Sequence, residues 1–108
     1  MTAARLDESA QGVYVIAATP FTARGEVDYE DACRLTDFYL GHGADGLTLL
    51  GVMGEQQKLS PAESVRLVEV VVRHVAGRVP VIVGAATPWI DNLKAFAGEV
   101  MAAGASGV

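Results

Sequence analysis

Short apolar runs recur along the chain, and glycine or proline closes each of them. They occupy residues 13–18, 46–50 and 79–83, and a fourth begins at 106–108. The runs are rich in β-branched residues and nearly free of polar positions, which is typical of strands covered on both faces of a parallel sheet. We therefore predict three such strands and the start of a fourth.

The segments between these runs are amphipathic and have recognisable helix ends. Asp28 is the predicted N-cap of a first helix, which ends at Gly41 or Gly43. Ser60 and Glu63, three positions apart, predict a capping box at the start of a second helix. Both signals mark where a strand-to-helix loop stops.

A third amphipathic segment begins at about Asp91 and ends at Gly104. In all three segments the apolar positions recur at helical spacing, and we expect them to face the core. The predicted inward residues are Ala32, Leu35, Phe38 and Tyr39 in the first helix, Val65, Val68, Val72 and Val75 in the second, and Leu93, Phe96, Ala97, Val100 and Met101 in the third.

The strand–helix unit repeats about every thirty residues, which is the size of a βαβ module. Right-handed crossovers place the carboxyl ends of all strands at one edge of the sheet. Ligands bind at that edge in such α/β folds. We therefore expect any functional residues in the loops 19–27, 51–59 and 84–90.

The composition narrows the class of protein. Hydrophobic residues make up 51% and charged residues 19% of the chain, which predicts a folded domain. A net charge of −5 disfavours nucleic acid as a partner, and no apolar run is long enough to cross a membrane. The single cysteine, Cys33, fits a reducing compartment. We expect a cytoplasmic protein with a polar leader at residues 1–11, which is not a secretory signal, followed by one domain segment at 12–108.

The loop after the second run contains two glycines in the sequence Gly51-Val52-Met53-Gly54-Glu55. Glycines let a backbone approach a ligand closely, and successive N–H groups can hold an anion. The same pattern also fits a loop in which the glycines serve turn geometry alone.

Further markers accompany this loop in a fixed order. They are Thr19-Pro20-Phe21, Gly25-x-Val27-Asp28, Gly43-Ala-Asp-Gly46, Leu59-Ser60 with Glu63, and Gly77-Arg-Val-Pro80-Val-Ile-Val-Gly84. Together they resemble the N-terminal part of the dihydrodipicolinate synthase and N-acetylneuraminate lyase family, over residues 12–108. The resemblance implies an α/β fold in which this chain forms three βα units and the start of strand four of a (β/α)₈ barrel. Because such a barrel needs about 250 residues, we expect the chain to be truncated.

The resemblance also implies a chemistry. Members of the family are homo-oligomers, usually tetramers, that form a Schiff base between a lysine on the sixth strand and pyruvate or a related 2-oxo acid. The protonated imine is an electron sink, so neither a metal nor another cofactor is expected. The implied residues for binding the 2-oxo acid carboxylate are Gly51, Val52, Met53 and Gly54, with Thr19, Pro20 and Glu55 supporting the loop.

Two departures from the family pattern qualify this expectation, at positions 52 and 53 and in the absence of the sixth strand that would carry the Schiff-base lysine. Val52 and Met53 stand where the family has two threonines, so the hydroxyls are missing and the pocket is expected to be more apolar. Backbone N–H groups still allow a carboxylate to bind, but the specific synthase activity does not follow. Neither Lys58, in the loop, nor Lys94, on the third helix, has the setting of an imine-forming amine. We therefore expect no catalytic residue in this chain and no activity from it alone.

Alternatives to a Schiff-base enzyme remain open on the sequence. The chain also fits a non-catalytic α/β module that binds a small acid or a partner, or a catalytically diverged member of the family. Glu55 is expected to fix the loop by accepting backbone N–H groups. Trp89 fits either the wall of a pocket or a packed anchor of its loop.

Overall fold

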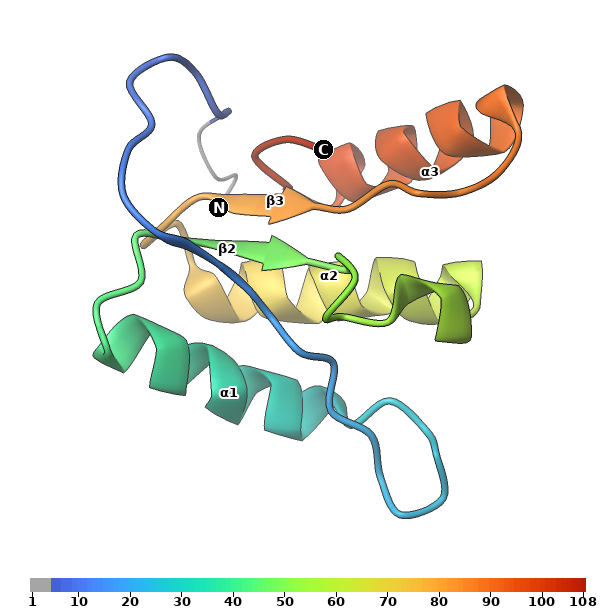
Figure 1. Cartoon of the computed structure of the whole chain (residues 1–108), viewed down its shortest axis with the longest axis horizontal. Helices are drawn as coiled ribbons and strands as arrows, with labels where there is room; N and C mark the ends of the chain where they lie inside the picture. The colour runs from blue at the N-terminus through green and yellow to red at the C-terminus, as the bar shows by residue number, and fades with distance from the viewer. Residues whose placement is uncertain (1–4) are drawn as a thin grey trace.

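Parallel strands, each followed by a helix, make up the structure (Figure 1). The structure, a computed structural model, describes residues 5–108. Its elements are β1 (Tyr14–Ile16), α1 (Tyr29–Gly41), β2 (Gly46–Leu49), the short 3₁₀ helix η1 (Gln56–Lys58), α2 (Pro61–Val75), β3 (Val81–Val83) and α3 (Ile90–Ala102). Each strand lies within its predicted run and is shorter than it. Gly107 forms a parallel bridge with Ile82, which confirms that a fourth extended segment begins there.

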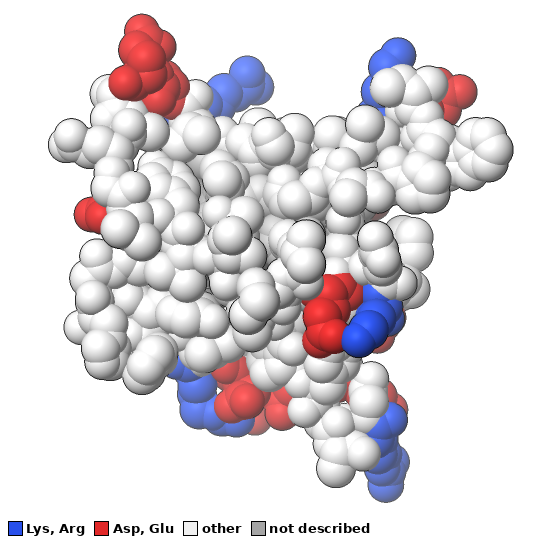
Figure 2. All heavy atoms as spheres, in the orientation of Figure 1, with Lys and Arg blue, Asp and Glu red and all other residues white. Residues whose placement is uncertain are grey.

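The sheet has the order β1-β2-β3, and its two faces differ. Leu47 pairs with Val15 and Val81, and the side chains of Leu47 and Val81 are fully buried against the helices. The opposite face carries the row Ile16, Thr48 and Ile82, and there Ile16 is 53% exposed. Figure 2 shows charged side chains mainly around the margin of the face toward the viewer, with an uncharged area between them.

Helix α1 begins as predicted, but one of its inward residues was assigned wrongly. Asp28 Oδ1 accepts a 2.9 Å hydrogen bond from the N–H of Asp31. The buried positions are Ala32 and Thr36, whereas Phe38 is 57% exposed and lies against the ring of His42. Thr36 is tolerated inside because its hydroxyl donates to the carbonyl of Ala32 at 2.8 Å. At about 100° per residue, Phe38 lies on the far side of the helix from Thr36.

Helix α2 forms the central part of the core. Its capping box is present, because Ser60 Oγ accepts from the N–H of Glu63 at 3.1 Å while Glu63 Oε1 accepts from the N–H of Ser60 at 2.8 Å. Val68, Val72 and Val75 are buried as predicted. The helix packs between α1 and α3 (Figure 1), and its buried residues extend from Ser64 to Val75.

Helix α3 and the leader complete the described chain. Phe96 and Val100 are buried as predicted. The helix begins at Ile90, directly after Trp89, whose φ is 70°. The described part of the leader is tied down at Leu6, whose N–H donates to the carbonyl of Ser106 at 2.8 Å, and residues 1–4 of the predicted leader lie outside the described residues. In residues 5–108 no helix has the length and apolarity that a membrane span requires.

Candidate functional site

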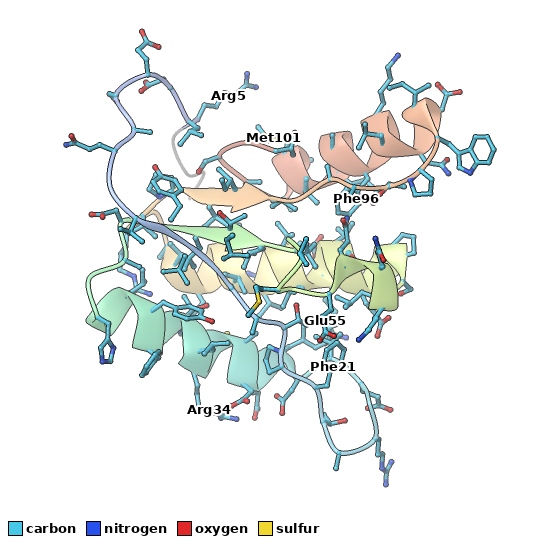
Figure 3. All side chains as sticks on the ribbon, in the orientation of Figure 1. Arg5, Phe21, Arg34, Glu55, Phe96 and Met101 are labelled. Atoms are coloured by element: carbon cyan, nitrogen blue, oxygen red, sulfur yellow. The ribbon has the colours of Figure 1, made fainter. Side chains whose placement is uncertain are left out.

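The loops that follow β1, β2 and β3 meet at the edge of the sheet where these strands end. This is the edge at which the βα order predicts ligand binding. Figure 3 shows Phe21 of the first loop and Glu55 of the second at this same end of the molecule. The loop 50–55, between β2 and η1, is the candidate site.

This loop is a tight reversal between two residues with left-handed backbones, Leu50 with φ 57° and Glu55 with φ 55°. Inside it, the N–H of Gly54 donates to the carbonyl of Gly51 and the N–H of Glu55 donates to that of Val52, both at 3.1 Å. Among the described residues no acceptor meets the N–H groups of Val52 and Met53. These two donors are therefore free to bind an anion.

The side chains of the same two residues point away from the core. Val52 is 95% exposed and Met53 is 62% exposed. Any group held at their N–H donors therefore has apolar side chains beside it and no hydroxyl from either residue.

Thr19 and Pro20 connect the first loop to this one and to α1. Thr19 is buried, and its hydroxyl donates to the carbonyl of Gly54 at 2.6 Å. The carbonyl of Pro20 accepts the N–H of Asp28, the N-cap of α1, at 2.9 Å. The structure thus brings Thr19 to the loop directly, while Pro20 contributes through the start of α1.

The carboxylate of Glu55 has a different partner from the one predicted. Its carboxylate was expected to accept backbone N–H groups, but Oε1 accepts from Lys58 Nζ instead. The three-residue turn of η1 brings the two side chains onto one side, which explains the pairing. Lys58 stays 71% exposed in this pair, so nothing desolvates its ammonium group.

Sequence reasoning missed a link between the second and third loops. Gln56 Oε1 accepts the N–H of Ala86 at 3.1 Å, across thirty positions of sequence. No local pattern predicts such a bond, because its partners meet only through the pairing of β2 with β3.

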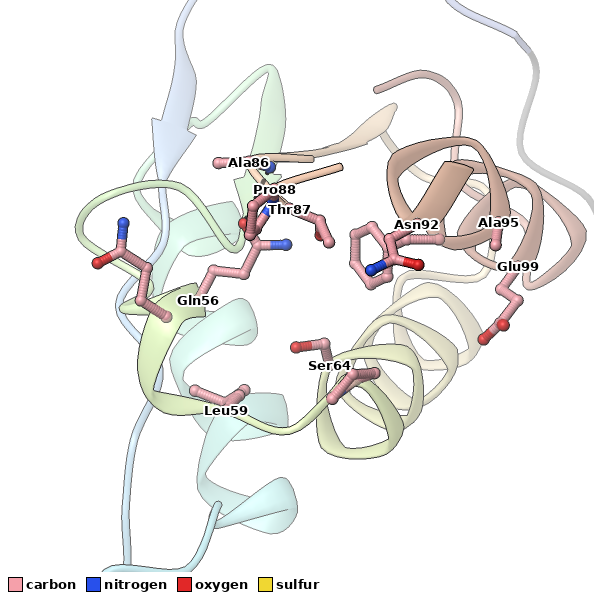
Figure 4. A pocket seen from close by; sticks show the side chains of 12 residues that line it. Gln56, Leu59, Ser64, Ala86, Thr87, Pro88, Asn92, Ala95 and Glu99 are labelled. Atoms are coloured by element: carbon pink, nitrogen blue, oxygen red, sulfur yellow. Dashed lines mark hydrogen bonds between the residues drawn. The ribbon is translucent and has the colours of Figure 1, made fainter. Parts of the chain in front are cut away.

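A cavity of about 410 Å³ opens beside this link, between η1, α2, the third loop and α3 (Figure 4). Its apolar part includes Leu59, Pro61 and Phe96, and polar groups of Ser64 and Asn92 face it. The residues Gly51–Gly54 do not line it. It was not predicted from the sequence, because it forms between elements that are distant along the chain.

The remaining candidates lie away from the loop. Trp89 has neither of its two expected roles. It does not line the cavity, and at 79% exposure it is not a packed anchor of its loop. His74 Nε2 lies 2.8 Å from Asp37 Oδ1 and joins α2 to α1. Cys33 is half-buried on α1, and burial together with the neighbouring Asp37 raises the pKa of its thiol. Lys94 is exposed on α3.

Comparison with known proteins agrees with this arrangement. Residues 9–108 match the family model described as the dihydrodipicolinate synthetase family. The 4-hydroxy-tetrahydrodipicolinate synthase of Neisseria meningitidis is 42% identical over 74 residues, which cover 68% of this chain and 25% of that protein. The chain thus spans about a quarter of the length of the curated relatives it matches.

Solved structures give the same result. The dihydrodipicolinate synthase of Rhodopseudomonas palustris superposes with a TM-score of 0.91 at 37% identity, over 98% of this chain and 35% of that one. The synthase of Aquifex aeolicus gives 0.86 at 33% identity, over 91% of this chain and 33% of its own. The predicted fold class, an N-terminal portion of a (β/α)₈ barrel, is confirmed. The chain belongs to the dihydrodipicolinate synthetase family.

Proposed function

We propose that this chain provides the carboxylate-binding part of a Schiff-base lyase, aldolase or synthase that acts on pyruvate or a related 2-oxo acid. The observation that supports it best is the pair of free N–H donors at Val52 and Met53, at the ligand-binding edge of the sheet. The two turn hydrogen bonds around them restrict the loop, so the donors are held before a ligand arrives.

A carboxylate is the ligand that these donors suit. Its two oxygens accept hydrogen bonds from adjacent N–H groups, and bonds to an ionised acceptor are stronger than neutral ones. Thr19 supports the position of the loop through Gly54, and the Glu55–Lys58 pair supports its far end. The apolar side chains of Val52 and Met53 favour an acid with an apolar surface near its carboxylate.

The chemical step requires an amine that this chain does not offer at the loop. Imine formation joins a neutral lysine amine to the keto carbon with loss of water, and the imine then takes up a proton. The protonated imine accepts the electron pair of the adjacent bond as that bond breaks. Lys58 is exposed and paired with Glu55, and Lys94 lies on the outer part of α3. We therefore propose that the 108 residues alone bind a 2-oxo acid without turning it over. In the active protein, which we propose is a homo-oligomer, each complete barrel provides its own lysine.

The first test is mass spectrometry of the chain after incubation with pyruvate and borohydride, alongside a titration of its amide resonances with pyruvate. We expect the Val52 and Met53 amides to shift and no reduced pyruvate to be attached. A barrel-length protein carrying this segment should gain the mass of one reduced pyruvate per chain. The absence of any pyruvate-dependent shift at Val52 and Met53 would contradict the proposal.

A catalytically diverged member of the family is the second candidate. The replacement of both expected hydroxyls by Val52 and Met53 favours it. Pyruvate binding without a reducible adduct in the barrel-length protein would support this candidate and exclude a Schiff-base enzyme.

A further inference from the structure

Leu50, the residue that joins β2 to the candidate loop, has an unusual backbone for its type. Its φ is 57°, a region that a residue with a Cβ rarely occupies, and its side chain is only 1% exposed. Backbone strain of this kind persists only where the surroundings hold it, and it is often found at functional sites.

The left-handed backbone changes where the side chain goes. Leu47 and Leu49 face the helices, and strand alternation would turn Leu50 to the opposite face, after Thr48. Instead Leu50 is also buried on the helix side, where it borders a small internal void together with Leu67 and Val71 of α2. The same rotation reverses the chain into Gly51, so the packing of one side chain sets the direction of the loop.

Two glycines make room for this backbone. A Cβ placed on Gly84, at the end of β3, would lie 2.4 Å from the carbonyl oxygen of Leu50. A Cβ placed on Gly54 would lie 2.9 Å from the Leu50 Cα and nitrogen. Both distances are shorter than real Cβ contacts. The backbones of Gly54 and Gly84 therefore pack directly against the main chain of Leu50 on two sides.

We propose that Leu50 is the positioning residue of the carboxylate-binding loop. Its buried side chain holds the left-handed backbone that orients the N–H donors of Val52 and Met53, and glycines at 54 and 84 leave the space for it. The inference rests on the proposed function, because the donors it orients are the ones proposed to bind the 2-oxo acid.

Two substitutions separate the backbone from the side chain. Leu50→Ala removes the packing and keeps the unfavourable φ, whereas Leu50→Gly removes nearly the same packing and makes that φ easy to adopt. Gly98→Ala, on α3, where an added Cβ meets nothing within 4 Å, is the matched control for glycine and alanine exchange.

The measurements are urea unfolding and titration with sodium pyruvate, followed by the Val52 and Met53 amide resonances, with sodium chloride as the ionic control. We expect Leu50→Gly to unfold at a higher urea concentration than Leu50→Ala, although alanine is the more stabilising residue at ordinary positions. Pyruvate binding should weaken about tenfold in Leu50→Ala and less in Leu50→Gly. Gly98→Ala should bind as the original chain does.

Failures of the two proposals are distinguishable. If the original chain gives no pyruvate-dependent shift, the proposed function is wrong, and the positioning role is wrong with it. If the original chain binds and Leu50→Ala binds equally well, only the positioning role is wrong. Should both variants fail to fold, three-bond couplings across the Leu50 N–Cα bond decide in the original chain. A positive φ with and without pyruvate supports the inference, and a negative φ overturns it.

Discussion

The hydroxyl of Thr19 donates a buried 2.6 Å hydrogen bond to the carbonyl of Gly54, and this bond joins the first two strand–helix loops. Thr19 is 6% exposed and Gly54 is buried, so the bond lies inside the protein. The bond fixes the loop on the side of β1, while Gln56 fixes it on the side of β3 through the N–H of Ala86. The candidate carboxylate site is therefore held from both neighbouring strands.

Thr19→Val should destabilise the fold by about 1–3 kcal/mol, because it leaves a buried carbonyl without its donor. Thr19→Ser keeps the hydroxyl and should recover most of that loss. Urea unfolding of the two variants measures the difference. Equal stability of Thr19→Val and Thr19→Ser would show that the bond contributes nothing to holding the loop.

The capping box should have a local effect of ordinary size. Ser60→Ala removes the acceptor for the N–H of Glu63 and should lower the free energy of unfolding by about 1 kcal/mol. Ser60→Thr retains the acceptor and serves as the control in thermal unfolding. The prediction fails if Ser60→Ala melts at the same temperature as Ser60→Thr and the original chain.

How much the sequence predicts depends on how local the cause is. The Ser60–Glu63 box and the Asp28 cap involve residues three apart, and both were predicted correctly. The exposure of Phe38 was predicted wrongly, because apolar spacing alone does not show that Thr36 satisfies its hydroxyl within its own helix. Periodicity gave the stripe of α1 but not its rotation about the helix axis.

The candidate site shows the same limit. The strand–helix order correctly predicts that Gly51 and Gly54 lie at the edge of the sheet where the strands end. It does not predict the left-handed backbone of Leu50, because this backbone needs the space that Gly84 leaves just after β3, and a lone leucine carries no signal for positive φ. The hydrogen bond between Gln56 and Ala86 cannot be predicted from the sequence either, since strand pairing brings the two residues together.

The contact between α1 and α2 includes a hydrogen bond between His74 and Asp37, and a double-mutant cycle can measure its strength. His74 Nε2 lies 2.8 Å from Asp37 Oδ1, with the two side chains 33% and 55% exposed. Replacing Asp37 by Asn and His74 by Gln, singly and together, should give a coupling of about 0.2–1 kcal/mol when His74 is charged. The coupling should fall at high salt, since exposed charges are screened. A coupling that does not change with salt would indicate a neutral hydrogen bond.

Cys33 provides a pH-dependent readout of the fold. Burial, with the charge of Asp37 as the second cause, raises the pKa of its thiol. The folded chain therefore binds the thiol proton more tightly than the unfolded chain. The protonated thiol therefore contributes to the free energy of unfolding. This contribution is present below the pKa of the thiol in the unfolded chain and is lost as pH rises through its pKa in the folded chain.

Because the thiolate is the reactive form, the pH profile of alkylation of Cys33 should lie at higher pH in the native chain than in urea. Iodoacetamide labelling is specific here, since Cys33 is the single cysteine. Asp37→Asn should move the native profile part of the way back while burial remains. Superimposed native and unfolded profiles would rule out a raised pKa.

The apolar residues of the loop allow a direct test of what it binds. Val52→Thr with Met53→Thr places hydroxyls beside the two free N–H donors. Because both side chains are exposed, the free energy of unfolding should change by less than about 0.5 kcal/mol. Each added hydrogen bond to a carboxylate is worth about 1 kcal/mol, so the affinity for pyruvate should rise at least about fivefold. A 2-oxo acid with a branched apolar chain should gain less affinity than pyruvate in the same variant, because its carboxylate gains the same hydrogen bonds while its side chain loses the apolar contacts. If both acids gain equally, the apolar pair does not select the ligand, and if neither changes, the carboxylate does not lie at this loop.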